Sequence, residues 1–266
     1  MRPRQITSPH NPQVKAWADL LTKKGRDKER RFLIEGVHLV QEALASRAPV
    51  ETIIYDAEKG LPEAISNCAG EAYLDWVAAS GAVLTKIADT KTPQGVCAIV
   101  RRADPGLDAA ALAEAKLAVV IDGVQDPGNL GTIIRSADAA AADAVIVGSG
   151  SVDMYNPKTI RSTMGSLFHI PVIECDLDEL FRLRKTLHAP DLQIVSTSLQ
   201  AAKDCYELDL RRPTWIVIGN EANGVSPKVA ANVDLQVKIP MPGKAESLNA
   251  AIAASVLLFE TVRQRR

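Results

Sequence analysis

Short apolar runs alternate with amphipathic helical patterns over residues 113–266. The runs are rich in valine and isoleucine, which is typical of strands in a sheet covered on both faces, and strands that alternate with helices form a mostly parallel α/β sheet. The predicted strands are 117–122, 144–148, 168–174, 192–197, 214–219 and 235–240. The predicted helices are 129–140, 156–166, 176–188 and 247–264.

The pattern before residue 102 is less regular but of the same kind. Strands are predicted at 31–36, 51–56, 82–87 and 95–101, with helices near 12–21, 37–46 and 71–80. The stretch RADPGLD at 102–108 holds Pro105 and Gly106, and such residues mark loops. We therefore expect a small α/β domain at 1–102, a linker at 103–112 and a larger α/β domain at 113–266.

Composition narrows the class of protein. The chain has 266 residues, 47% of them hydrophobic, which is enough for two modest cores. No run approaches the roughly 18 apolar residues of a membrane span, and the N-terminus has no apolar stretch that could act as a signal, so we expect a cytoplasmic protein. The chain has four cysteines, Cys68, Cys97, Cys175 and Cys205. They are scattered singly with no CxxC pair, which argues against a disulfide framework or a zinc site.

Charge is distributed unevenly along the chain. Residues 1–31 carry nine basic and three acidic side chains, a local charge of +6, although the formal net charge of the chain is −1. A basic N-terminal arm favours a polyanionic partner, and a solvated helix face is the alternative. Aromatic residues are only 4% of the chain, so RNA binding would depend on phosphate contacts and shape rather than an extended stacking platform. The candidate RNA-binding residues of the arm are Arg26, Lys28, Arg30 and Arg31.

Ligand sites of parallel α/β sheets lie beyond the carboxyl ends of the strands, and three polar stretches follow predicted strands. In the first, IDGVQDPGNLGTIIRSADAA, a helix begins near Asn129, whose side chain is a natural N-cap. Arg135 follows six residues later and projects close to the same side of the helix. The alternative is that Asn129 only caps the helix and Arg135 pairs with Asp138.

The second stretch, TWIVIGNEANGVS, runs from an apolar strand into Gly219, Asn220, Glu221 and Gly224. Glycine at a strand end permits close approach of a flat ligand to the backbone. A tight turn would explain the same glycines.

The third stretch, VKIPMPGKAESLNAAIAASVLLFE, leads from a strand through a proline-glycine loop into the last helix. Ser247 can cap this helix. Asn249 would lie in its first turn, where asparagine has no propensity advantage. The helix start also offers free N–H groups to an anion.

Several classes of chemistry lack their motifs. The sequence has no GxGxxG after a strand, no GxxxxGK[ST] and no GxSxG, which argues against dinucleotide binding, nucleotide hydrolysis and triad hydrolysis. The four histidines lack metal-ligand spacing, so we expect no metal.

Together the three stretches resemble the motifs of the SpoU-type (TrmH-like) family of RNA ribose 2′-O-methyltransferases. The matching segments are DPGNLGTIIRSADA, IVIGNEANGVS and IPMPGKAESLNAAIA, spread over residues 117–262. The earlier segments FLIEGVHLVQEAL and QGVCAIV are similar to the substrate-binding domain of that family, an RNA-binding fold like ribosomal protein L30e. The resemblance implies a deep trefoil knot in the larger domain, although chains generally avoid knots. It also implies S-adenosylmethionine as cofactor and an active site completed across a homodimer.

Carried onto this sequence, the resemblance places five residues at the catalytic site: Asn129, Arg135, Glu221, Ser247 and Asn249. It places the cofactor against Thr197, Ser198, Leu199, Gly219, Asn220, Ile239, Met241, Ser247 and Leu248. Arg135 would also contact RNA. Because a guanidinium does not give up its proton in proteins, we expect Arg135 to grip a phosphate and stabilise developing alkoxide charge, while the phosphate or a water takes the proton.

The resemblance leads to one main prediction of function and two alternatives. The main prediction is methyl transfer from S-adenosylmethionine to a ribose 2′-hydroxyl of structured RNA, with 23S ribosomal RNA as the expected substrate. Transfer RNA is an alternative substrate. A non-catalytic RNA-binding or ribosome-assembly factor of the same fold is the alternative from another class.

Overall fold

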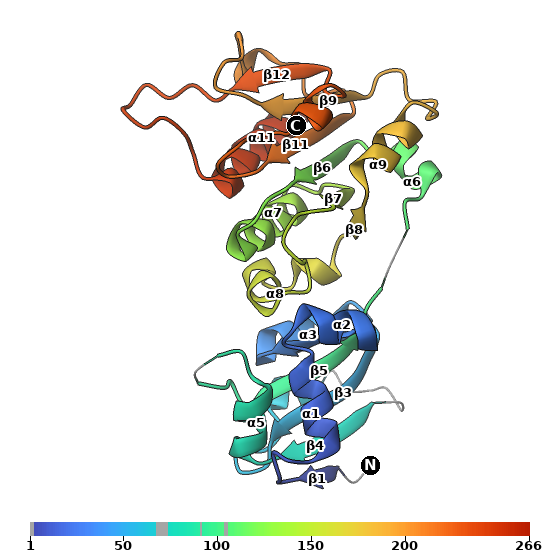
Figure 1. Ribbon diagram of the computed structural model, residues 1–266, viewed down its shortest axis with the longest axis vertical. Helices are drawn as coiled ribbons and strands as arrows, with labels where there is room; N and C mark the ends of the chain where they lie inside the picture. Colours follow the sequence, from blue (N-terminus) through green and yellow to red (C-terminus); the bar gives the residue numbers. More distant parts are fainter. Residues whose placement is uncertain (1–2, 68–73, 91, 104–105) are drawn as a thin grey trace. The chain divides into compact units, whose positions relative to one another are not determined.

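Two separate units make up the chain in the computed structural model, which describes residues 3–67, 74–90, 92–103 and 106–266 (Figure 1). The first unit comprises Met1–Ala103 and Tyr155–Phe168, and the second comprises Asp104–Met154 and His169–Arg266. The chain therefore leaves the second unit once, returns a short segment to the first, and then completes the second.

The sheet of the first unit has five strands in the order β1-β4-β3-β5-β2. β1, β4 and β3 run parallel, and β5 is antiparallel to both β3 and β2. The strands are β1 Arg4–Ile6, β2 Arg31–Glu35, β3 Val50–Asp56, β4 Asp75–Ala79 and β5 Val96–Arg101. An α/β fold was predicted for this part of the chain, and the sheet confirms it.

The N-terminal residues belong to the body of the first unit. β1 pairs with β4, and Val14, Trp17 and Leu20 are buried in the core beneath the sheet. The segment was predicted to be a basic arm within the domain at 1–102, and its apolar side chains pack into the core of this unit. The helices of the unit are α1 Pro12–Asp19, α2 Lys23–Glu29, α3 Val37–Ala45, α4 Glu63–Ser66 and α5 Gly81–Ile87.

Two neighbouring segments have a different secondary structure from the one predicted. Residues 71–80 were predicted as a helix; 71–73 lie outside the described residues, and β4 occupies Asp75–Ala79 between β1 and β3. Residues 82–87 were predicted as a strand and form helix α5, with the Ser80 hydroxyl accepting a hydrogen bond from the Val83 amide. Short apolar runs fit either period, and pairing with β1 and β3 decides in favour of a strand for the first run.

Residues 155–168 belong to the first unit, where two of their aromatic rings pack against Phe32. The segment contains α8 Pro157–Thr163 and the 3-10 turn η1 Ser166–Phe168. The ring of Phe32 lies 4.6 Å from that of Tyr155 and 6.4 Å from that of Phe168, centroid to centroid. The Tyr155 hydroxyl donates to the carbonyl of Ala103, and Arg102 lies over the same ring at 4.6 Å. These contacts explain why a segment far along the chain packs with the N-terminal residues.

Seven parallel strands form the sheet of the second unit, in the order β10-β12-β9-β11-β6-β7-β8. The prediction of a mostly parallel sheet is confirmed. The expected strand at 168–174 is shorter, because Ser166–Phe168 form a 3-10 turn. The strands are β6 Leu117–Asp122, β7 Ala144–Gly148, β8 Val172–Cys175, β9 Gln193–Thr197, β10 Lys203–Asp204, β11 Thr214–Gly219 and β12 Leu235–Lys238.

Helices cover both faces of this sheet, as predicted. α7 and α11 pack together on one side, and α6 and α9 lie on the other (Figure 1). Leu112 of α6 is buried in the core between this sheet and the helices α6 and α9. The expected linker at 103–112 therefore ends before α6. The helices are α6 Ala109–Glu114, α7 Pro127–Ala139, α9 Leu177–Arg184, α10 Pro227–Ala230 and α11 Ala250–Gln264, with a 3-10 turn η2 at Cys205–Glu207. The trefoil knot stays a prediction.

Within the described ranges, no helix is long and apolar enough to cross a membrane. Cys97, Cys175 and Cys205 are free thiols, and Cys68 lies outside the described residues. Burial raises the pKa of the Cys175 thiol to about 11, so this side chain stays protonated at neutral pH.

Candidate active site

The strand order reverses between β6 and β11. From β6 the sheet continues to β7 and β8, and from β11 it continues to β9 and β12. Asp122 and Gly219, the last residues of β6 and β11, are register partners. Crevices at such switch points are the usual ligand sites of parallel α/β sheets. Two of the three sequence stretches therefore meet at the edge where a ligand is expected.

A tight turn follows β11. The main chains of Asn220 and Gly224 exchange two hydrogen bonds of 2.9 Å each. A Cβ atom at Gly219 would lie 2.2 Å from the carbonyl carbon of Gly224, so only glycine fits there. The Asn220 side-chain amide donates to the carbonyl of Gly123 in the loop after β6, at 2.9 Å. Of the two explanations for these glycines, the geometry favours the tight turn.

Glu221, at the tip of this turn, binds the loop after β6. Its carboxylate accepts hydrogen bonds from the backbone amides of Gln125 and Asp126, at 3.0 and 3.1 Å, and from Nδ2 of Asn129, at 2.9 Å. Burial acts to raise the pKa of Glu221, but the hydrogen bonds from Asn129 and the two amides outweigh it, and the pKa lies below the usual glutamate value. The side chain is therefore an ionised anchor for the loop.

Asn129 lies in the first turn of α7 rather than at its cap. The cap is Asp126, whose Oδ1 accepts from the Asn129 backbone amide at 2.9 Å. The prediction of Asn129 as N-cap is wrong, because the proline at position 127 starts the helix two residues earlier. Its side chain is thereby free to donate to Glu221 and to accept from Asn249.

Asn249 is the cap of α11. Its Oδ1 accepts from the amides of Ala251 and Ile252 at 2.9 and 3.3 Å, and its Nδ2 donates to Oδ1 of Asn129 at 2.8 Å. Ser247 was predicted to cap this helix, and this is wrong because the helix begins at Ala250, with Ser247 exposed in the preceding loop. Three of the five predicted catalytic side chains therefore form one chain of hydrogen bonds, from Glu221 through Asn129 to Asn249.

Arg135 is exposed on α7, and it makes no hydrogen bond or ion pair with the described residues. The predicted alternative partner, Asp138, instead binds Nδ1 of His169 at 2.8 Å. The Arg135 guanidinium therefore keeps its five N–H donors available.

The predicted cofactor residues follow three neighbouring strands, β9, β11 and β12. Thr197 ends β9 and is a register partner of Val237 in β12, and the Ser198 amide donates to the Val237 carbonyl at 2.9 Å. Ile239 and Met241 follow β12 and are half-buried. Leu199 and Leu248, by contrast, are exposed by 56% and 38%. Leu199 follows β9 and Leu248 directly precedes the cap of α11, and each offers an exposed apolar surface to a ligand.

The predicted RNA-binding residues of the first unit differ in exposure. Arg26 is only 2% exposed, and its Nη1 donates to the Leu20 carbonyl at 2.8 Å, which removes it from the side chains that can reach a phosphate. Arg31 is half-buried and donates through Nε to Glu51. Lys28 and Arg30 are exposed.

Two contributors to the site escaped the sequence reasoning. Gln125 donates from Nε2 to the carbonyls of Gly123 and Gly150, at 2.9 and 2.7 Å, and so holds the loop after β6 to the loop after β7. The Asp122 carboxylate accepts from the Ser226 amide at 2.6 Å. Asp122 ends β6 and Gln125 lies in the loop after it, so their position at a strand end was the available signal. Among the described residues no group of three His, Cys, Asp or Glu side chains could hold a metal ion.

The model of the SpoU rRNA Methylase family matches residues 116–259, which include the whole Glu221–Asn129–Asn249 chain of hydrogen bonds. The chain belongs to this family. The resemblance seen in the three motifs is thus confirmed. The MRM3-like substrate binding domain matches residues 11–98, within the first unit of this family member.

Curated relatives cover nearly the whole of this family member. The 23S rRNA (guanosine(2553)-2'-O)-methyltransferase RlmP of Bacillus subtilis is 39% identical over 256 residues, which cover 96% of this chain and 98% of the relative. The 23S rRNA (uridine(2479)-2'-O)-methyltransferase of Streptomyces viridochromogenes is 34% identical, with 98% and 93% covered. By their names, these two relatives methylate the 2′-oxygen of a guanosine and of a uridine, respectively.

Solved structures share the fold of this family member. The SpoU methyltransferase AviRb from Streptomyces viridochromogenes, in complex with the cofactor AdoMet, has a TM-score of 0.87 at 32% identity, with 96% of this chain and 98% of that chain covered. The AdoMet-bound rRNA methyltransferase from Sinorhizobium meliloti has a TM-score of 0.84 at 32% identity, with 98% and 97% covered. S-adenosylmethionine is therefore the cofactor of the family.

Proposed function

We propose that this protein transfers a methyl group from S-adenosylmethionine to the 2′-hydroxyl of one ribose in 23S ribosomal RNA. The observation that carries the proposal is the hydrogen-bond chain from Glu221 through Asn129 to Asn249, which joins the three predicted motifs at the switch point of the sheet. Full-length relatives with this chemistry support it.

The loops after β9, β11 and β12 fit the cofactor. Leu199 and Leu248 present apolar side chains, and the backbone groups of Ser198, Ile239 and Met241 lie near the ends of two adjacent strands. An adenine ring binds against apolar side chains with a few polar backbone groups beside it. When bound there, S-adenosylmethionine supplies a methyl group on a sulfonium centre.

Glu221 and Asn129 act in this proposal by positioning. The Glu221 carboxylate already accepts three hydrogen bonds, and its lowered pKa makes it a poor proton acceptor. Asn129 and Asn249 fix the start of α7 against the start of α11. Holding reacting groups in line contributes up to roughly 7–11 kcal/mol to such a reaction.

Arg135 is the group proposed to contact the RNA at the reacting ribose. Its guanidinium stays protonated, so it binds the neighbouring phosphate through two N–H donors and stabilises the charge that develops on the 2′-oxygen. The proton leaves the hydroxyl for a phosphate oxygen or a water. The exposed position of Arg135 on α7, without a partner in the described chain, suits this role.

The first unit is proposed to hold structured RNA. Exposed basic side chains at Lys23, Lys24, Lys28 and Arg30 lie on and directly after α2 and can contact phosphates. Arg26, being buried, is left out. In terms of function we assign residues 1–102 to RNA binding and 113–266 to methyl transfer. The trefoil knot is proposed for residues 113–266. The protein is proposed to work in the cytoplasm, with ribosomal RNA as its substrate.

A homodimer is proposed through α11. Ile252 and Phe259 are each 50% exposed and lie seven residues apart, on one face of the helix. Val256, between them on that face, is half-buried. An exposed apolar stripe beside a catalytic cap is expected at an interface with a second copy of this chain.

The decisive experiment is a methyl-transfer assay with radiolabelled S-adenosylmethionine, offering unmodified 23S ribosomal RNA and transfer RNA separately. Digestion then maps any 2′-O-methyl nucleotide. We expect label on one ribose of 23S ribosomal RNA. Label on transfer RNA alone would identify the alternative substrate, and absence of cofactor binding would favour the non-catalytic RNA-binding factor.

A further inference from the structure

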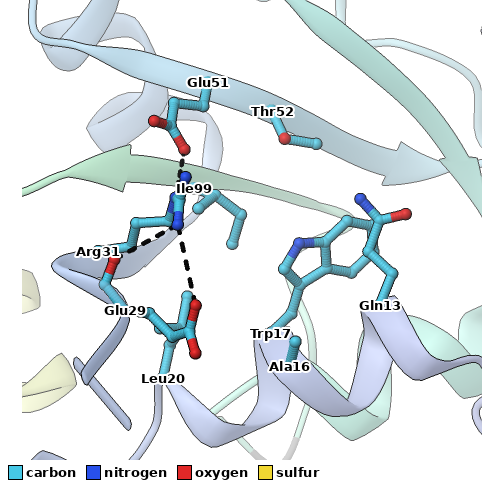
Figure 2. Close-up of a pocket in the computed structure, with 9 residues that line it drawn as sticks. All are labelled: Gln13, Ala16, Trp17, Leu20, Glu29, Arg31, Glu51, Thr52 and Ile99. Atoms are coloured by element: carbon cyan, nitrogen blue, oxygen red, sulfur yellow. Dashed lines mark hydrogen bonds and ion pairs between the residues drawn. The ribbon is translucent and has the colours of Figure 1, made fainter. Parts of the chain in front are cut away.

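A pocket of about 250 Å³ opens in the first unit, outside the methyl-transfer site (Figure 2). Its walls come from helix α1, which carries Gln13 and Trp17, and from strands β2 and β3, which carry Arg31, Glu51 and Thr52. Pockets for drug-sized ligands measure roughly 300–1,000 Å³. This one therefore suits a smaller group.

Two polar groups of the pocket have no partner among the described residues. Trp17 is 6% exposed and Thr52 is 7% exposed, and neither the Trp17 indole N–H nor the Thr52 hydroxyl makes a hydrogen bond with the described chain. Both side chains line the cavity, with the indole nitrogen on the side of Arg31 (Figure 2). Neither polar atom is fully enclosed by protein, so both are accessible from the pocket. The two groups point to a ligand with complementary polar atoms.

An irregularity in β3 builds the polar wall. The pairing of β3 with β5 shifts register between Val50 and Thr52, at Glu51. In a regular strand adjacent side chains point to opposite faces, but a bulge redirects one of them. Glu51 and Thr52 therefore line the same pocket although they are neighbours in sequence.

The charges of the pocket are already balanced. The Glu51 carboxylate accepts from Nε of Arg31 and from Nε of Arg101, at 2.5 and 3.1 Å. Arg31 also faces Glu29, at 3.9 Å. A phosphate needs an unpaired cation, which this arrangement does not supply. A neutral group with both donors and acceptors is accommodated, because each carboxylate oxygen retains a free lone pair.

We propose that this pocket binds one unpaired nucleobase of the RNA substrate. Specific RNA recognition uses splayed-out bases that are hydrogen-bonded along their edges. The Trp17 N–H and Thr52 hydroxyl serve acceptor atoms of the base, and Glu51 serves its N–H donors. The inference rests on the proposed function, because it takes RNA as the substrate. With such a pocket, the first unit would recognise a base of the RNA in addition to contacting its phosphates.

The test compares Trp17→Phe and Thr52→Val with matched controls in the same unit. Thr52→Val removes the hydroxyl and keeps nearly the same shape. Trp17→Phe removes the indole N–H together with one ring of the bicyclic side chain, a loss of volume that the Trp76→Phe control reproduces. Trp76→Phe and Thr85→Val make the same changes at a half-buried and an exposed position outside the pocket. Binding of unmodified 23S ribosomal RNA to the full chain is measured over a range of salt concentrations, alongside thermal unfolding.

We expect each pocket variant to bind RNA about 3- to 10-fold more weakly, the effect of one lost hydrogen bond. The slope of log affinity against log salt should stay unchanged, because no phosphate contact is lost. The controls should bind like the wild type. Affinities equal to those of the controls, or a reduced salt slope, would overturn the base pocket while methyl transfer by the wild type still upheld the proposed function. A wild type that neither binds nor methylates RNA would refute both.

Discussion

Asn249 donates a side-chain hydrogen bond to Asn129 at 2.8 Å, although 120 residues separate them in the chain. The donor caps α11 and the acceptor lies in the first turn of α7, so one bond sets the starts of two helices against each other. Asn129 in turn donates to Glu221. The order of donors and acceptors fixes the orientation of both amides.

Replacing Asn129 with aspartate should disrupt this chain. Asn129→Asp removes the donor to Glu221 and places a second carboxylate beside it. Loss of a hydrogen bond to a charged group costs about 1.5–3 kcal/mol, and methyl transfer should fall at least about 100-fold because positioning is lost. Asn232→Asp, in the turn after α10, removes a side-chain donor to the Lys228 carbonyl outside this chain of hydrogen bonds and is the control. Activity near the wild-type level in Asn129→Asp would contradict the positioning role.

Glu221 should make stability depend on acid pH. Its folded-state pKa lies below the value of about 4.3 for an unfolded glutamate. A group with a lowered folded-state pKa stabilises the protein above the unfolded pKa, and this contribution disappears as the pH falls through the folded pKa. Urea unfolding from pH 7 to pH 3 should therefore show a steeper loss of stability for the wild type than for Glu221→Gln. Parallel curves would refute the linkage.

Arg135→Lys tests the guanidinium role. The charge is kept but the two-donor geometry is lost, so the turnover rate should drop by about 100-fold, in the range seen for loss of a transition-state donor. Stability should change by less than about 0.5 kcal/mol, since the side chain is exposed and contacts nothing in the described chain. Arg182→Lys, exposed on α9, is the matched control. Near-normal turnover in Arg135→Lys would rule out the phosphate grip.

Gly219→Ala should destabilise the second unit. The added Cβ would meet the backbone of Gly224 at 2.2 Å, and overpacking of this kind costs about 1–3 kcal/mol. Gly243→Ala adds the same atom where nothing lies within 4 Å, so it should shift stability by less than about 1 kcal/mol. Thermal unfolding of the two variants gives the comparison. Equal melting temperatures would mean that the turn after β11 adjusts without strain.

A charge on the exposed face of α11 should break the proposed homodimer. Phe259→Glu places a carboxylate on the stripe formed with Ile252, where burial against a second copy would leave it unpaired. Sedimentation should show monomers for this variant and dimers for the wild type. Thr186→Glu adds the same charge in the exposed turn after α9 and should remain dimeric. A Phe259→Glu protein that sediments as a dimer would exclude this face.

Prediction of the fold succeeded where pattern and length agreed. The strands ending at Asp122 and Gly219 are apolar, β-branched and bounded by polar loops, and both lie where they were expected. It failed at residues 75–87, where each short run fits a helix or a strand equally well. There the pairing of β4 with β1 and β3 decides, and no local signal records that pairing.

For the site as well, some features could be predicted from the sequence and others could not. The sequence by itself determined the strand-helix alternation, the three motifs and hence the family, because these depend on residue type and order. Only the tertiary structure decided that Asn249 caps α11 in place of Ser247, that Arg26 is buried and that Tyr155 packs against Phe32. The packing of Tyr155 on Phe32 and the hydrogen bond from Asn249 to Asn129 join residues far apart in the chain, and the periodicity of a local segment carries no information about its distant partner.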